Sequence, residues 1–167
     1  MSISFRACAL LLACFFLLAL LPLTAQQEKA SAPVPGSEYS GMYSFLRDGE
    51  FVQVTVENQG KVTGFVSRYG DLDSDRGAFL DQFFKQGKLE GNKLTFTTET
   101  VHGIWFEFRG TVERGEGKKA GDEAYYLIKG TLTENSTDDA KKTSSRTRDV
   151  TLKSFPQDVN PTHEERK

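Results

Sequence analysis

The most informative absence from this sequence is cysteine. Only Cys8 and Cys14 occur in 167 residues, and both lie in the first 25. The remainder therefore has no thiol for a disulfide, a catalytic nucleophile or a thiolate metal site. It also lacks Gly-x-Ser-x-Gly, His-Glu-x-x-His and a phosphate-binding loop. These absences favour a protein that is not an enzyme, with catalysis by carboxylates alone as the alternative.

An excess of positive charge is also missing. The chain has 21 Lys and Arg against 23 Asp and Glu, and without Arg6, in the N-terminal segment, the balance is 20 against 23, a net charge of −3. Nucleic-acid binding requires concentrated positive charge. The composition therefore argues against a nucleic-acid partner.

The N-terminus has the order of a secretory signal. Arg6 precedes an almost entirely apolar run, 7–23, and the small residue Ala25 follows. This pattern predicts a signal peptide over 1–25 and a secreted or periplasmic mature protein. An uncleaved anchor, which would be the only membrane contact, is an alternative because the run approaches the ~17 residues that span a bilayer. Lipidation at Cys14 is disfavoured, since the run continues past it.

Three segments follow the predicted signal. Residues 26–40 carry Pro33, Pro35 and Gly36 without apolar periodicity, which predicts a flexible spacer. Residues 156–167 are expected to be a disordered, charged tail. Between them, apolar residues recur at every second position with no helical period, so 41–155 is predicted to be one all-β domain.

The alternation of apolar and polar residues predicts eight antiparallel strands, each with one buried and one solvent-exposed face. Gly- and Asn-containing turns at 48–49, 58–60 and 91–92 suit tight hairpins. The strands are expected at 41–47, 51–57, 61–69, 83–90, 93–99, 104–113, 125–133 and 146–155. Lys85 interrupts an apolar face, and a bulge that turns its charge outward is expected.

A glycine repeat indicates how this sheet closes. Gly64, Gly87, Gly110 and Gly130 are spaced 23, 23 and 20 residues apart, each two positions before a Val or Leu. Glycine on a buried face lets a strand coil or bulge, which bends a sheet until it closes. Closure also removes exposed edges. We therefore predict a small antiparallel up-and-down β-barrel, with a β-sandwich as the alternative.

This strand order resembles the calycin group of lipocalin- and avidin-type barrels. Gly41-Met42-Tyr43 is similar to the Gly-x-Trp of that group, with Tyr43 in the place of Trp. The resemblance implies a barrel that binds a small molecule.

The sequence as a whole is interpreted as a non-enzymatic binding or interaction module of the cell envelope or extracellular space. Its partner is expected to be a small molecule or an envelope protein. Because Phe-rich faces can fill a narrow barrel, surface interaction is slightly favoured over a deep pocket. A structural protein of the envelope is a further alternative.

Connections 48–50, 70–82, 100–103 and 134–145 should meet at one end, the predicted mouth. Binding residues often lie on loops held by a rigid scaffold. Asp71, Asp73 and Asp75 alternate in one such loop, a spacing that suits Ca²⁺, although Arg76 and Gln82 stand where an EF-hand has Gly and Glu. A weakly bound Ca²⁺ is therefore the only cofactor predicted, with a solvated acidic loop as the alternative.

Three further residues are predicted to form a ligand lip at the mouth. These are Tyr69, His102 and Trp105, the last two being the only histidine and the only tryptophan of the predicted domain. The alternative is a loop histidine beside an aromatic side chain that packs at the rim.

Overall fold

The structure is a computed structural model and describes residues 33–71, 73, 75–138 and 140–157. The predicted signal peptide, 1–25, lies outside these residues, as do 26–32 of the predicted spacer and 158–167 of the predicted tail. Within the described ranges, no helix has the length and hydropathy needed to cross a membrane.

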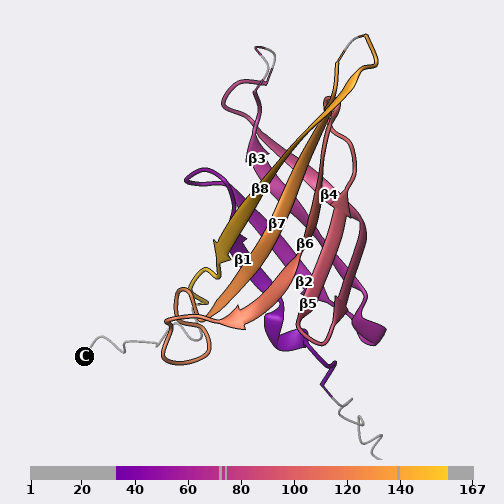
Figure 1. Ribbon diagram of the computed structural model, residues 1–167. Coiled ribbons are helices and arrows are strands. Elements are labelled where there is room, and N and C mark those ends of the chain that lie inside the picture. Colours follow the sequence, from indigo (N-terminus) through magenta and orange to yellow (C-terminus); the bar gives the residue numbers. More distant parts are fainter. Residues whose placement is uncertain (1–32, 72, 74, 139, 158–167) are drawn as a thin grey trace, which may run out of the picture. The chain divides into compact units, whose positions relative to one another are not determined.

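Eight antiparallel strands form one sheet in which each strand pairs with the next along the chain (Figure 1). The sheet curls into a half-barrel, which confirms the predicted all-β up-and-down architecture. The strands are β1 (Gly41–Ser44), β2 (Phe51–Val56), β3 (Val62–Tyr69), β4 (Phe79–Glu90), β5 (Lys93–Thr98), β6 (Ile104–Arg114), β7 (Tyr126–Thr137) and β8 (Thr143–Lys153). Two short 3₁₀ turns, η2 (Ser37–Tyr39) and η3 (Asn58–Gly60), lie beside them.

The main departures from the predicted strands are at the mouth. β4 begins at Phe79 rather than at residue 83, because Phe79 pairs with Tyr69 and their rings lie 4.5 Å apart. The β7–β8 hairpin extends through hydroxyl pairs such as Ser136 with Ser144. Hydroxyl residues on both faces give no alternation of apolar and polar residues, so sequence periodicity missed this extension.

Apolar side chains fill the lower interior of the half-barrel. Phe96 lies between Phe84 and Phe108, with ring centroids 4.4 and 5.1 Å apart. The buried core consists of Tyr43, Phe45, Val52, Val54, Val56, Val62, Val66, Leu89, Leu94, Phe96, Phe106, Phe108, Val112, Ile128, Leu132 and Leu152. The interior is thus packed rather than hollow over most of its length.

The predicted placement of the four repeat glycines inside strands, not turns, is confirmed. Gly110 and Gly130 face each other across β6 and β7. A Cβ on Gly110 would lie 2.2 Å from the carbonyl oxygen of Lys129, and one on Gly130 would lie 2.3 Å from that of Arg109. The strands approach this closely only because neither residue has a side chain.

The predicted outward turn of Lys85 is also confirmed. The register of β4 against β5 shifts between Phe84 and Gln86, and Lys85 is exposed at this bulge. The ladder of β4 with β3 runs from Phe79 to Phe83, and its ladder with β5 runs from Phe84 to Glu90. The bulge therefore marks the bend at which β4 passes from one half of the sheet to the other.

The ends of the sheet, β1 and β8, meet over a short seam. Tyr43 and Ser154 form an isolated bridge, and the Phe155 amide donates to the Met42 carbonyl at 2.8 Å. The Lys153 amide donates to Ser44 Oγ at 2.9 Å. Because β1 ends at Ser44, the rest of β8 pairs with β7 alone, and the half-barrel stays open beside it.

The seam tyrosine should make the fold sensitive to alkali. Burial, followed by the charges of Tyr126 and Tyr39, raises the pKa of Tyr43 well above its usual range. Stability from this group is present below the unfolded pKa of about 10 and is lost as pH rises beyond it, by up to about 1.4 kcal/mol per pH unit. When the free energy of unfolding is measured with urea at several pH values above that pKa, it should fall less per pH unit in Tyr43→Phe than in wild type. An equal fall in the two proteins would contradict the raised pKa of Tyr43.

A side chain at the glycine crossing should oppose the curl of the sheet. We expect Gly110→Val to lower the free energy of unfolding by about 3 kcal/mol, because the new side chain meets the Lys129 carbonyl. Thr111→Val, next along β6 on the outward face, is the matched control and should change stability little, since valine suits a strand. Denaturant unfolding of both variants gives the comparison, and similar losses would refute a special role for Gly110.

Candidate functional site

The mouth end of the interior contains a buried carboxylate. Glu50 is 2% exposed. One of its oxygens accepts from Arg47 Nε at 2.8 Å and from the Tyr69 amide at 3.0 Å, and the other accepts from the Arg47 amide at 3.1 Å. Burial lowers the pKa of Arg47, but the hydrogen bond and charge of Glu50, with those of Asp71, raise it overall. Glu50 thus ties the β1–β2 hairpin to the end of β3 as an ion pair.

A buried cation, Arg68, also crosses the interior. Arg68 is 4% exposed and donates through Nε to Gln82 Oε1 at 2.6 Å and through Nη1 to Asp71 at 3.1 Å. Gln82, fully buried, donates in turn to the backbone carbonyls of Ile104 and Glu99 at 2.8 and 3.2 Å. This chain of bonds joins β3, β4 and β6, and it pairs polar groups that would be costly to bury alone.

Above this network lies a cavity of about 230 Å³, which we call the mouth cavity. It lies inside the half-barrel, between the β1–β2 hairpin on one side and β7 and β8 on the other. Its lining combines four apolar side chains with three arginines and three carboxylates. They are Phe45, Leu46, Arg47, Glu50, Arg68, Asp71, Ile104, Phe106, Glu134 and Arg148.

Arg148 is the residue of this cavity with spare bonding capacity. Its Nη2 atom donates to Glu134 Oε2 at 2.5 Å. Its Nε atom is buried and has no hydrogen-bond partner within the described part of the chain. Leaving a buried donor unpaired costs about 1–3 kcal/mol, and more when the group is charged. The β8 side of the cavity therefore carries a guanidinium with one buried donor unpaired among the described residues.

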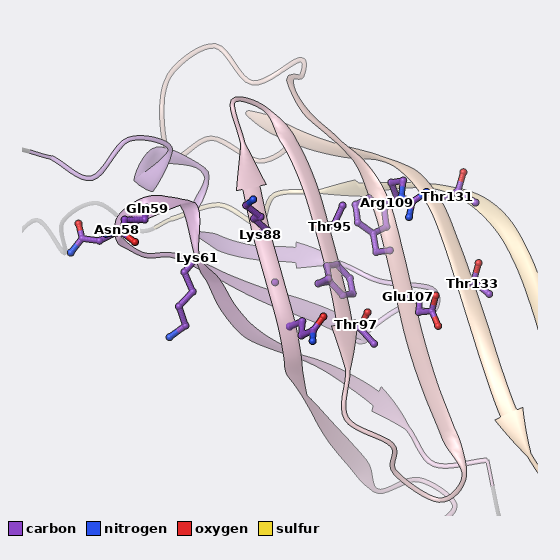
Figure 2. Close-up of a pocket in the computed structure, with 14 residues that line it drawn as sticks. Asn58, Gln59, Lys61, Lys88, Thr95, Thr97, Glu107, Arg109, Thr131 and Thr133 are labelled. Carbon is purple, nitrogen blue, oxygen red and sulfur yellow. The ribbon is translucent and has the colours of Figure 1, made fainter.

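A larger hollow, the outer groove, lies outside the barrel over β4 to β7 (Figure 2). It measures about 900 Å³, and its labelled side chains include Lys88, Thr95, Glu107, Arg109 and Thr131. Some of its hydroxyls are bonded across strands, as in the 3.0 Å bond from Thr131 to Asp149. Its lining combines threonines and charged side chains with the rings of Phe96 and Phe108, on the open outer face of the sheet.

Solved structures of avidin-like proteins share this fold. A rhizavidin–biotin complex covers 72% of this chain and 95% of its own, with a TM-score of 0.50 and 11% identity. Rhizavidin covers 74% and 87%, with a TM-score of 0.51 and 12% identity, and intact apo afifavidin covers 75% and 87%, with 0.50 and 14%. At these identities the likeness shows the fold alone. It confirms the expected resemblance to avidin-type barrels.

No protein-family model matches the sequence, and no curated protein matches it.

The structure gives each predicted calcium ligand a basic partner. Asp71 pairs with Arg47 and Arg68 at 3.2 and 3.1 Å, and Asp73 pairs with Arg76 at 2.5 Å. Asp75 pairs with His102 at 2.5 Å. Among the described residues, no three His, Cys, Asp or Glu side chains are grouped as metal ligands would be. Calcium binding stays a prediction, and it would require these carboxylates to exchange their present partners.

The predicted lip residues also have separate partners. Tyr69 stacks on Phe79 outside the barrel, and His102 bonds to Asp75. Trp105 Nε1 donates to Glu107 at 3.4 Å on the outward face. None of the three lines the mouth cavity. A shared lip therefore stays a prediction.

Sequence reasoning missed the charges inside the mouth. Glu50 follows the turn at Asp48-Gly49, where a carboxylate is ordinarily solvated. Arg68 lies two positions after Val66, and Arg148 lies four before Leu152, so both fall on the apolar face of their strands. The available signal was an arginine at the alternate positions that buried residues occupy. The alternation of apolar residues defines the strands but does not by itself identify such an interior charge.

Removing the Glu50 carboxylate should loosen this end of the barrel. We expect Glu50→Ala to cost about 2–4 kcal/mol of stability, because it leaves the Tyr69 amide unpaired and removes the Arg47 ion pair. Glu57→Ala is the matched control, since Glu57 makes a comparable pair with Lys61 at the surface. Its removal should change stability little. Thermal and denaturant unfolding compare the two, and a small effect of Glu50→Ala would contradict its role.

Proposed function

We propose that this protein is a non-enzymatic binding barrel that takes a small molecule into the mouth cavity. The observation that carries the proposal is Arg148, whose buried Nε has no acceptor among the described residues and which lines an interior cavity open beside β8. Buried polar groups are normally paired, so a ligand oxygen toward which the Arg148 side chain turns would satisfy this donor.

The lining indicates the class of ligand. Phe45, Leu46, Ile104 and Phe106 supply apolar walls, and three arginines balance three carboxylates. A volume of about 230 Å³ is below the roughly 300–1,000 Å³ of most ligand pockets. These properties suit a compact molecule with an apolar body and one carbonyl or carboxylate group that accepts from Arg148.

The ion pairs favour binding over catalysis. Glu50, Asp71 and Glu134, the carboxylates of the cavity, each contact an arginine. An ion pair occupies each of these carboxylates with a partner from the same chain. Their role in this proposal is to hold the arginines in place. Biotin is a sensible first probe, because rhizavidin, which shares the fold, forms a complex with it.

The site can be tested by ligand retention. Native mass spectrometry of protein purified from its own host should show a retained small molecule, and calorimetric titration should test biotin directly. We expect Arg148→Leu to lower affinity by at least tenfold, the equivalent of about 1.4 kcal/mol for a lost charged hydrogen bond.

Arg109→Leu supplies the control, because Arg109 is an exposed arginine of the outer groove. It should leave binding unchanged. If Arg109→Leu abolishes binding and Arg148→Leu preserves it, the ligand occupies the outer groove and the proposal is wrong. Leu46→Trp, which fills the mouth cavity from its wall, should block binding while retaining all the charges.

A further inference from the structure

The outward face of β2, β3 and β4 carries an unusual group of aromatic side chains, the aromatic stripe. Phe65 on β3 lies between Phe51 and Phe83, with ring centroids 5.8 and 5.5 Å apart. Beside them Tyr69 stacks on Phe79. Phe83 is 60% exposed and Phe79 is 50% exposed. The stripe therefore presents connected apolar surface to solvent.

The rest of the outward face is different. Over β5 to β7 it consists largely of threonines and charged residues, as the outer groove shows (Figure 2). Single exposed apolar residues are normal on a protein surface, but connected patches mark interaction sites. Apart from Trp105 on β6, the outward aromatic residues of the described strands lie together on β2, β3 and β4, which indicates a docking surface there.

Charges on β4 indicate what docks. Asp81 lies two residues before Phe83, and Lys85 lies two residues after it, both exposed. The bulge between Phe84 and Gln86 keeps Lys85 outside the barrel, although sequence alternation places it on the apolar face. Phe83 is thus flanked along its own strand by opposite charges at equal separation.

We propose that the aromatic stripe binds a second copy of this chain. In a two-fold dimer whose axis lies in the interface, across β4 and level with Phe83, the two β4 strands run antiparallel. Phe83 then meets Phe83 of the partner subunit, and Asp81 meets Lys85 of the partner subunit. Phe65 is level with Phe83 in the register of β3 and β4, so it too meets its own copy. A patch that is self-complementary in this way fits an isologous interface.

The size of the patch sets the strength of association. Stable interfaces bury about 800 Å² on each partner, and a fully buried aromatic side chain contributes roughly 150–250 Å². The five aromatic residues of the stripe are partly covered already, so they supply only part of that area. A reversible dimer with a dissociation constant on the order of micromolar is expected.

Sedimentation velocity over a wide concentration range, on protein purified after expression of the full chain, tests the dimer. We expect a concentration-dependent monomer–dimer equilibrium, and Phe83→Ser should abolish it. Asp81→Lys and Lys85→Asp should each weaken self-association roughly tenfold, because each opposes like charges across the axis.

The double variant Asp81→Lys, Lys85→Asp restores opposite charges and should recover the dimer. A merely structural role of Asp81, which accepts a bond from Ser67 at 2.7 Å, would not give this rescue. Denaturant unfolding of each variant shows that it is folded. A monomer at all concentrations, or a double variant no better than the single ones, would overturn the proposal. Ligand retention by the monomeric Phe83→Ser variant tests the mouth cavity separately.

Discussion

Close approach of neighbouring backbones at glycine is the constraint on which the rest of this structure depends. Where Gly110 faces Gly130, a single added carbon on either residue would overlap the opposite strand. Gly87 approaches the Val62 carbonyl in the same way, at 2.3 Å from a Cβ position. These contacts lie inside strands, so the sheet coils without interrupting its pairing. Without that curvature the inward faces of the eight strands would have no common core.

The curl produces an interior with two different halves. Its lower part is filled by stacked phenylalanines, which leaves little room for a ligand. Its upper part is bounded by Glu50, Arg68 and Gln82, whose bonds fix the walls before any ligand arrives. Preorganised walls reduce the entropy lost on binding. The mouth cavity is consequently small but rigidly framed, and Arg148 is the group of this frame with a donor unused among the described residues.

The alternation of apolar and polar residues was sufficient to predict the strands and their order, because each strand has one solvent-exposed and one buried face. The glycine repeat correctly indicated coiling inside strands, and the lone charge at Lys85 correctly indicated a bulge. The mouth was harder to predict. Hydroxyl-rich strand ends carry no alternation, and the pairing of Arg68 with Gln82 depends on a register between β3 and β4 that periodicity does not specify. Calcium binding by the loop carboxylates stays a prediction, and periodicity could not indicate that the fold places a basic side chain beside each of them.

The one-ended seam between β1 and β8 has a mechanical consequence. The free length of β8 is held to β7 by paired hydroxyls, such as Thr133 with Thr147 and Thr137 with Thr143, so the hairpin bends as one body. Its fixed point is the bridge from Tyr43 to Ser154, at the opposite end from the mouth. A rotation about that bridge would widen the opening most at the mouth, because displacement grows with distance from the fixed point. In a protein that binds a ligand as proposed, bending of this hairpin would therefore admit the ligand while leaving the packed core in place.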